Sequence, residues 1–211
     1  IIFCGVHFMA ETAKILSPEK KVILPDINSG CPMADMISAG QLKKLKEKHP
    51  DAVVVCYVNS SARVKALSDI CCTSSNAVNV VKSIPKNKKI IFIPDKYLGG
   101  YVQKQTGREL ILWDGYCPIH ATIDVNDILR LKNEHPTAEV LVHPECPPDV
   151  IDIADEVTST GGMLKYVKKS QKKNFIIGTE IGIIHRLKKE NPNKNFYSAA
   201  SNAICPDMKL I

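Results

Sequence analysis

Three cysteines, each followed by proline, are the residues whose type and spacing point most clearly to chemistry in this sequence. They are Cys31, Cys117 and Cys205, and they stand 86 and then 88 residues apart. Such near-even spacing indicates a repeat that supplies one thiol per unit. Three thiolates that converge from distant segments would form a metal site, which a reducing compartment favours over a disulfide framework.

The proline after each cysteine predicts the local structure. Proline is favoured at the first position of a helix, so the cysteine would occupy the cap, where the positive helix end favours the thiolate. A single Cys-Pro is explained more simply by burial of a small apolar side chain. Three of them at matching positions of a repeat favour a set of metal ligands.

The other five cysteines are weaker candidates. Cys146 is also followed by proline, but it lies at the other end of its unit, and we interpret it as structural. The remaining four lie inside or at the end of apolar runs, where we expect them to be buried: Cys4, Cys56, Cys71 and Cys72.

The number of ligands predicts the kind of metal centre. Three thiolates without a fourth ligand at matching spacing disfavour a closed structural zinc site, which uses four ligands. They suit one four-iron, four-sulfur (4Fe-4S) cluster whose fourth iron stays open. An open iron is a Lewis acid that can hold hydroxyl and carboxylate oxygens during elimination chemistry.

The repeat becomes explicit when segments are aligned. Residues 41–59 match residues 127–145 at a shift of 86, and residues 88–95 match residues 173–180 at a shift of 85. In each unit, short Val- and Ile-rich runs alternate with segments of helical period. This alternation predicts parallel strands joined by crossover helices.

Individual elements can be predicted within these units. Helices should end before Pro50 and Pro136, because proline disfavours their continuation. The runs that follow, at 52–58 and 138–144, are apolar on both faces, as expected of central strands in a covered parallel sheet.

A second alignment connects the two ends of the chain. Residues 17–33 resemble residues 191–208, and in both the proline precedes the cysteine by 13 residues. The first residues, IIFCG, read as a strand already under way, and we expect the natural protein to be longer. The predicted fold is three pseudo-threefold-related, three-layer α/β/α domains with parallel sheets around a central site, the first domain being incomplete. The predicted bounds are 1–31 with 206–211 returning to it, 32–117 for the second domain, and 118–205 for the third.

Polar side chains stand at the predicted carboxyl ends of strands, where parallel α/β sheets bind ligands. By the repeat, Tyr57 corresponds to His143 and Asn59 to Glu145. His and Glu can move protons, while Tyr and Asn can orient a carbonyl or carboxylate. A hydrogen-bonded strand end would explain any one of these residues, but four in register favour a site.

Hydroxyl side chains follow the second strand of each unit. Thr73, Ser74 and Ser75 in one unit, and Thr158, Ser159 and Thr160 in the other, precede a predicted helix and could form an anion cradle with its free amides. Simple N-capping is the alternative. His120, one helical turn after Cys117, should face the surroundings of the metal centre.

Composition limits the class of protein. The chain has 211 residues, 45% of them hydrophobic, and no apolar run near the roughly 20 residues that span a bilayer. No secretory leader pattern is present, so we expect a cytoplasmic protein without a membrane partner. The net charge of +6 comes from short lysine runs at helix ends and in loops, which favours solvated surfaces over nucleic-acid binding.

Nearly the whole chain resembles the quinolinate synthase family. The resemblance rests on segments that include LPDINSGCPMADM, SDICCTSSNAV, WDGYCPIH, HPEC, TSTGGML and the closing CPDM. It implies a transferase of NAD biosynthesis that condenses iminoaspartate with dihydroxyacetone phosphate to quinolinate, with loss of phosphate and water. It further implies one 4Fe-4S cluster on Cys31, Cys117 and Cys205, and the enzyme that supplies iminoaspartate as a partner.

The resemblance also implies roles for individual residues. Glu145 would be the general base, with Tyr57 as its partner in proton transfer, and His143, Ser159 and Thr160 would receive carboxylates or phosphate. The implied substrate contacts are Tyr57, Asn59, Ser74, His120, His143, Glu145, Ser159 and Thr160. The family's N-terminal His-x-Tyr pair and serine are not in this sequence.

Two other interpretations remain at this stage. One is another three-domain 4Fe-4S enzyme with one cysteine per domain, such as the isoprenoid-pathway reductase or the diphthamide-forming radical enzyme. The other is a metal-free α/β binding module whose cysteines belong to the core.

Overall fold

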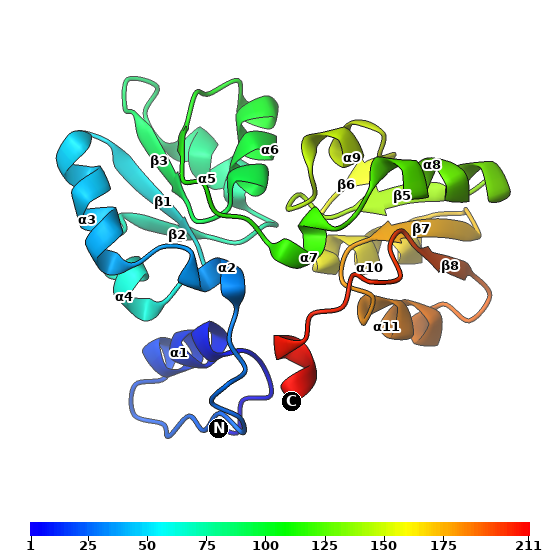
Figure 1. The fold of residues 1–211 in the computed structure, drawn as a ribbon, viewed down its shortest axis with the longest axis horizontal. Helices are drawn as coiled ribbons and strands as arrows, with labels where there is room; N and C mark the ends of the chain where they lie inside the picture. Colours follow the sequence, from blue (N-terminus) through cyan, green and yellow to red (C-terminus); the bar gives the residue numbers. More distant parts are fainter. The chain divides into compact units, whose positions relative to one another are not determined.

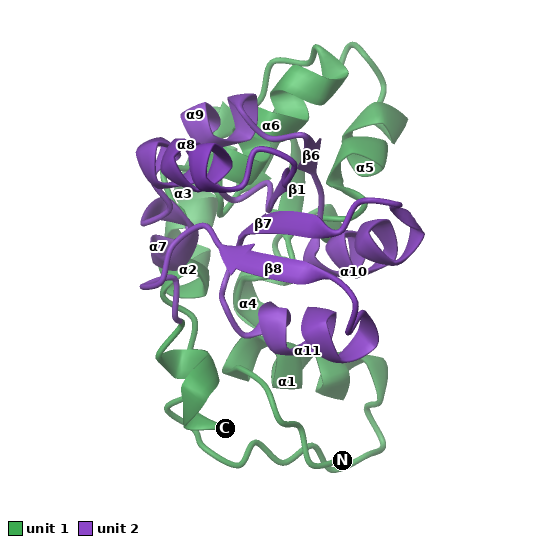
Figure 2. Ribbon diagram, turned by 90° about the vertical axis from the view of Figure 1, so that its right-hand side faces the viewer, with its two compact units in different colours: residues 1–116, 205–211 green, residues 117–204 purple.

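The computed structural model describes residues 1–211 and divides them into two compact units. Unit 1 comprises residues 1–116 and 205–211, and unit 2 comprises residues 117–204 (Figure 2). Each unit contains one four-stranded parallel sheet with helices (Figure 1). The α/β class with parallel sheets, predicted from the alternation of apolar runs, is confirmed.

Unit 1 begins with three helices and then alternates strands with helices. Its elements are α1 (His7–Leu16), α2 (Pro32–Asp35), α3 (Ala39–Lys48), β1 (Val53–Tyr57), α4 (Ala62–Lys65), β2 (Ile70–Cys72), α5 (Ala77–Ser83), β3 (Ile90–Ile93), α6 (Lys96–Thr106), β4 (Ile111–Leu112) and the closing 3-10 helix η1 (Asp207–Leu210). The strand order is β2-β1-β3-β4, which makes β1 and β3 the central strands.

Helices cover both faces of this sheet. On one face, Val54 of β1 and Ile91 of β3 pack in a cluster with Leu42 of α3 and Val64 of α4. On the other face, α6 approaches β3 so closely that a Cβ on Gly99 would lie 3.0 Å from Phe92. The apolar character of both faces, read from the sequence, therefore corresponds to a helix layer on each side.

Unit 2 repeats the same order of elements. They are α7 (Pro118–Ala121), α8 (Val125–Glu134), β5 (Glu139–Val142), α9 (Pro148–Asp152), β6 (Glu156–Val157), α10 (Thr160–Lys169), β7 (Asn174–Gly178), α11 (Ile183–Glu190) and β8 (Asn195–Ser198). The strand order β6-β5-β7-β8 matches that of unit 1 strand for strand.

Two buried clusters cover the faces of the second sheet. Ile128 of α8 and Val150 of α9 pack against Val140 of β5 on one face. Met163 of α10 and Leu187 of α11 pack with buried residues of the β5, β7 and β8 strands on the other. This is the three-layer α/β/α arrangement, and each buried aliphatic side chain contributes about 1.5–3 kcal/mol to its stability.

The predicted helix ends are confirmed, and local chemistry explains them. Helix α3 begins with a capping box in which Ser38 accepts from the Gln41 amide and the Gln41 side chain accepts from the Ser38 amide. It ends at Lys48, two residues before Pro50. Helix α8 ends at Glu134, again two residues before a proline.

The strand predicted for the first five residues is wrong. Only one parallel bridge forms there, between Ile2 and Ile23, and Phe3 donates a hydrogen bond to the Ile23 carbonyl. The residues that follow this segment form a small cluster, in which Val6 and Phe8 pack with Ala34 of α2. The partition into three domains, bounded at residues 31, 117 and 205, stays a prediction.

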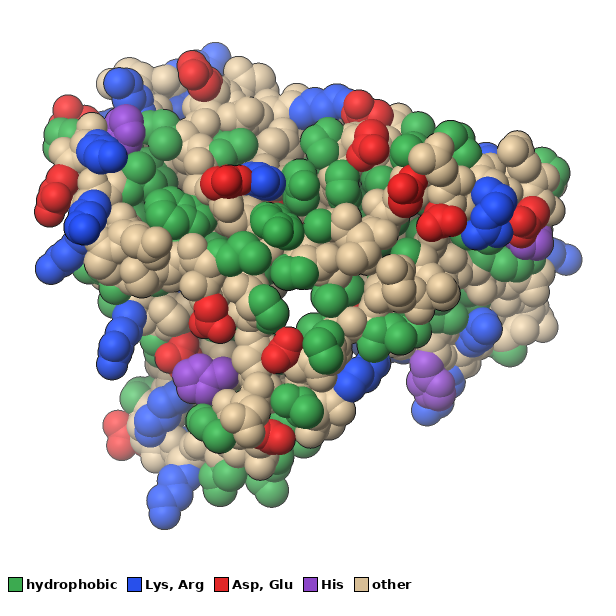
Figure 3. Space-filling model, in the orientation of Figure 1, with side chains coloured by type: hydrophobic (Ala, Val, Ile, Leu, Met, Phe, Trp, Pro, Cys, Tyr) green, Lys and Arg blue, Asp and Glu red, His purple; other side chains and the backbone are tan.

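Two surface properties bear on function. No helix in the structure combines the length and the apolar character needed to cross a membrane. On the face drawn in Figure 3, Lys and Arg side chains are distributed over the surface, with Asp and Glu among them. The lysine runs in the sequence therefore do not gather into one basic patch on that face.

Candidate active site

Cys117 opens unit 2 as the N-cap of helix α7, with Pro118 at the first helical position. The sequence predicts this arrangement, because proline at that position needs no amide donor. The short helix turns His120 back toward the cysteine. His120 is buried, with 8% of its surface exposed, while Cys117 is half-buried.

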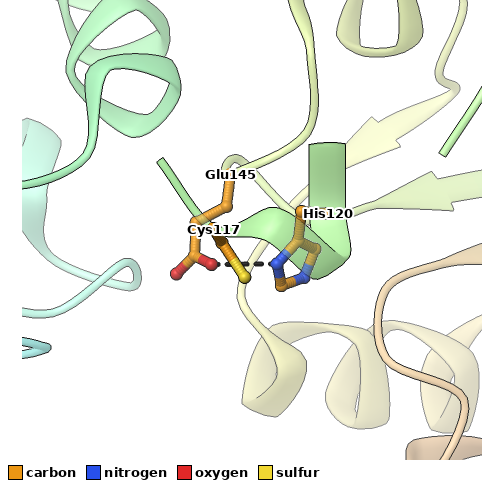
Figure 4. A group of neighbouring side chains, drawn as sticks. All are labelled: Cys117, His120 and Glu145. Atoms are coloured by element: carbon orange, nitrogen blue, oxygen red, sulfur yellow. Dashed lines mark ion pairs between the residues drawn. The ribbon is translucent and has the colours of Figure 1, made fainter. Parts of the chain in front are cut away.

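Cys117, His120 and Glu145 form one compact group in unit 2 (Figure 4). A sulfur, a ring nitrogen and a carboxylate oxygen from these residues all lie within 4.8 Å of one another. His120 Nδ1 lies 2.9 Å from Glu145 Oε2, as an ion pair without hydrogen-bond geometry. Glu145 is 3% exposed, so the pair is shielded from water.

The environment of His120 keeps its imidazole charged. Burial lowers its pKa, but the Glu145 carboxylate and the Cys117 thiol together outweigh burial and raise that pKa to about 10. A buried carboxylate beside a buried imidazolium is stable only as a pair, because either charge alone would be costly. This places a proton donor and an acceptor side by side in a dry site.

The pKa of His143 is shifted in the opposite direction to that of His120, although the two rings stack with 4.7 Å between their centroids. His143 directly follows β5, and its amide donates to the Gly178 carbonyl at the end of β7. Burial, and secondarily the His120 charge, lower the pKa of His143 to about 4, against the raising effect of Glu145. The Glu145 amide donates to His143 Nδ1 at 3.4 Å, which leaves the proton of the neutral ring on Nε2.

Thr179 belongs to this site and was not predicted from the sequence. It follows β7, is 2% exposed, and its Oγ1 lies 2.8 Å from His120 Nε2. His120 is therefore held through both ring nitrogens, by Thr179 on one side and Glu145 on the other. The repeat gives no signal for it, since Thr179 aligns with Pro94, a residue that has no side-chain hydroxyl.

The other two candidate ligands lie in unit 1, and both are half-buried. Cys31 caps helix α2, with Pro32 at its first position, as predicted. Cys205 is a correction, because Pro206 is itself the N-cap of η1 and the cysteine stands one residue before it. The two segments are neighbours, since a Cβ on Gly30 would lie 4.0 Å from Asp207 Oδ1.

The predicted polar residues of unit 1 also follow strand ends. Tyr57 is the last residue of β1 and is 5% exposed. Asn59 and Ser74 lie in the loops after β1 and β2, and both are half-buried. In the second loop the Thr73 amide donates to the Asn76 side chain, which orders the approach to α5.

The hydroxyls of unit 2 stand at the start of α10. Ser159 is its N-cap and accepts a hydrogen bond from the Gly162 amide at 3.2 Å. Thr160 is the first helical residue and is exposed. Capping therefore engages the Ser159 hydroxyl, while Thr160 presents its side chain to solvent.

The remaining cysteines divide by exposure. Cys56, Cys72 and Cys146 are buried, and the Cys146 thiol donates to the Gly178 carbonyl. The expectation that Cys4 and Cys71 are buried is wrong, since both are exposed. The reason is position, because Cys71 lies on an edge strand and Cys4 in the segment that forms only a bridge.

The chemistry of these donor groups fits a metal centre. Half-buried thiols, as at Cys31, Cys117 and Cys205, are the ligand type that iron-sulfur clusters use. Around Cys117, the imidazole of His120 and the carboxylate of Glu145 are groups that can bind a metal ion or move protons.

Comparison with known proteins gives a consistent picture. The family model described as "Quinolinate synthetase A protein" matches residues 1–211. The chain is 56% identical over 210 residues to a protein named quinolinate synthase from Dehalococcoides mccartyi strain CBDB1, and this covers all of the chain and 69% of that protein. A quinolinate synthase of Methanosarcina barkeri is 53% identical over 211 residues, with the same coverage.

Among solved structures, the E-1-hydroxy-2-methyl-but-2-enyl-4-diphosphate reductase of Plasmodium falciparum matches 85% of this chain and 59% of its own. The TM-score is 0.37 and the sequence identity is 13%. A likeness at this level carries no argument about fold or function.

Proposed function

The chain belongs to the quinolinate synthetase A family, whose activity in NAD biosynthesis is quinolinate synthesis, and we propose that it acts as a transferase that condenses iminoaspartate with dihydroxyacetone phosphate, with loss of phosphate and water. Forming the pyridine ring this way requires protons to be removed from carbon and delivered to leaving oxygens. A buried acid-base group can carry out both proton transfers if it lies beside the centre that holds the substrate.

We propose that Cys31, Cys117 and Cys205 hold one 4Fe-4S cluster. Support comes from their half-buried thiols and from the proline that follows each of them. When bound, such a cluster supplies an open iron that acts as a Lewis acid toward hydroxyl and carboxylate oxygens.

Proton transfer falls to Glu145 in this proposal. Its carboxylate, paired with the His120 imidazolium, can accept a proton from the substrate and then pass that proton to a leaving oxygen, which restores the ion pair. Thr179 fixes the direction of the imidazole through Nε2. Tyr57, at the equivalent strand end of unit 1, is the proposed partner in proton transfer.

The residues proposed to bind the anionic groups of the substrates are uncharged hydrogen-bonding residues. His143 is neutral at physiological pH, because its pKa is lowered to about 4, and so it donates one hydrogen bond from Nε2 to a carboxylate. Thr160 offers an exposed hydroxyl at a helix start beside Ser159. Asn59 and Ser74 are the proposed contacts from unit 1.

The proposed partners are the two small substrates and the enzyme that supplies iminoaspartate, in the cytoplasm. Nothing in the proposal requires nucleic acid or a membrane. The modest positive charge of the chain, +6, would favour the approach of these anionic substrates.

The observation that carries this proposal is the buried group of Cys117, His120 and Glu145 in a member of this family. To test it, the protein is purified anaerobically, its iron and sulfide are measured, and quinolinate and phosphate are followed with both substrates present. We expect about four irons per chain and quinolinate release in step with phosphate. A protein without iron and sulfide, its cysteines intact, would contradict the cluster, and an iron-loaded protein that releases phosphate without quinolinate would contradict the reaction.

A further inference from the structure

Two cysteines outside the candidate site face each other across neighbouring strands of unit 1. Cys56 of β1 and Cys71 of β2 are direct partners in the parallel ladder. Partners in register project to the same face of a sheet, with backbones about 4.8 Å apart. That spacing lies within the Cα range of roughly 4.4–6.8 Å in which a disulfide can form, and each thiol shifts the pKa of the other.

The two thiols differ in access. Cys71 is exposed on β2, the edge strand of the sheet, whereas Cys56 is fully buried in the cluster beneath helices α3 and α4. A reagent in solvent therefore reacts first with Cys71, and Cys56 can react only with the modified Cys71. Because β2 has only three residues and one neighbouring strand, fewer backbone hydrogen bonds hold it than hold a central strand.

The local electrostatics also shift the pKa values of the two thiols in opposite directions. The hydrogen bond from Cys56, aided by the positive charge of Lys65 on α4 and opposed by partial burial, lowers the pKa of Cys71 to about 6. The same contact and burial raise the pKa of Cys56. At neutral pH the exposed sulfur is mostly thiolate, the nucleophilic form, and the buried sulfur keeps its proton.

We propose that Cys71 is a redox modification site, at which a hydroperoxide oxidises the thiolate to a sulfenic acid that Cys56 then converts into a Cys56–Cys71 disulfide. In the first step the Cys71 sulfur attacks the peroxide oxygen, the O–O bond breaks, and hydroxide (or the alcohol of an organic peroxide) leaves. In the second step the Cys56 sulfur attacks the sulfenic sulfur, and its proton leaves with the sulfenic oxygen as water. Both cysteines are oxidised, and the peroxide is reduced. None of this depends on the activity proposed above.

Peptide mapping tests the link directly, because trypsin releases the two thiols in separate peptides, residues 49–63 and 66–82. The anaerobically purified protein is treated with hydrogen peroxide at a low molar excess, alkylated and digested without reductant. We expect a pair of these peptides joined by a disulfide and lost on reduction. Cys71→Ser should abolish the pair, whereas Cys72→Ser should retain it, because Cys72 is buried and burial, with the nearby Cys71, raises its pKa to about 12.

A pair that persists in Cys71→Ser would overturn the proposal, since Cys72 would then be the linked residue. So would oxidation of Cys71 to the sulfinic acid with no linked peptides at any peroxide dose. Circular dichroism spectra that match the unmodified chain show that each variant is folded.

The rate of alkylation tests the roles of the neighbours. Iodoacetamide at pH 7 should label Cys71 faster than Cys4, the other exposed cysteine. Cys56→Ala should slow the labelling of Cys71 roughly tenfold, because the thiolate fraction falls when the hydrogen-bond donor is lost. Lys65→Gln should slow it severalfold and Lys82→Gln, on the exposed side of α5, should not. Equal rates at Cys71 and Cys4 in the unmodified chain would overturn the assignment of Cys71 as the reactive thiol.

Discussion

The two sheets share one strand order, yet the side chains at their equivalent strand ends differ in chemistry. In unit 2, His143 directly follows β5 and Glu145 comes two residues later, whereas in unit 1 Tyr57 ends β1 and Asn59 comes two residues later. The pair in unit 2 is buried and combines an imidazole with a carboxylate, whereas the pair in unit 1 combines a phenol with an amide.

The same contrast extends to the residues that support these pairs. Unit 2 places His120 one turn after its cysteine and Thr179 after β7, and these two hydrogen-bond. At the matching positions unit 1 has Ala34 and Pro94. A repeated scaffold thus carries the buried imidazole–carboxylate pair in one copy only, and the difference lies in a few side chains rather than in the backbone.

The largest effect is expected from the cysteines. Cys117→Ser should lower the iron content of the anaerobically purified protein to less than about a tenth, because serine is a poor iron-sulfur ligand. Cys31→Ser and Cys205→Ser should do the same. Cys146→Ser is the matched control, since it is buried against Gly178 and is not a proposed ligand. Iron loss as severe in Cys146→Ser would remove the distinction between the cysteines.

The next largest effect is expected when His120 of unit 2 is replaced by alanine, the residue at the matching position 34 of unit 1. His120→Ala should slow quinolinate formation by roughly 10²- to 10³-fold, because Glu145 loses its proton partner. His185→Ala, an exposed histidine on α11, is the control. Rates that fall equally in both variants would show that the contrast between the units is not catalytic.

A smaller effect is expected where Thr179 orients the imidazole. Thr179→Val keeps the shape but removes the hydroxyl from His120, and should slow the reaction about tenfold, as the loss of an orienting partner commonly does. Thr179→Ser should restore most of the rate. If valine and serine behave alike at equal iron content, the hydroxyl has no positioning role.

The smallest effect concerns the start of α10. A Cβ on Gly162 would lie 1.9 Å from Thr158 Oγ1, so Gly162→Ala should lower the free energy of unfolding by about 1–3 kcal/mol. Gly161→Ala meets no atom within 4 Å and should raise it by a few tenths of a kcal/mol to about 1 kcal/mol. Thermal or urea unfolding of the two variants measures the difference, and equal stabilities would contradict the close approach of Thr158.

The features that were predicted correctly from the sequence are those that follow from the order of residues along the chain. The apolar runs that became β1 and β5, the prolines that follow α3 and α8, and the register of Tyr57 with His143 all reflect local rules that a repeat shows twice. Those rules act over a few residues, and the structure follows them.

Other features depend on contacts between distant residues and were missed. Thr179 meets His120 across 59 positions of sequence, so no local pattern identifies it. Cys71 is exposed because its strand lies at the edge of a sheet, which an apolar run cannot indicate. The strand expected at the N-terminus lacks a partner longer than one bridge, and so it does not form.

The central claim is that Glu145 moves the protons of the reaction and that its unit 1 counterpart, Asn59, does not. The most direct measurement is the rate of quinolinate formation by Glu145→Gln and by the exposed control Glu134→Gln, with iron measured in the same samples. We expect equal iron in both, a normal rate for Glu134→Gln, and a loss of at least about 10²-fold for Glu145→Gln. A Glu145→Gln protein with full iron content and a rate within about twofold of the unmodified enzyme would contradict the account.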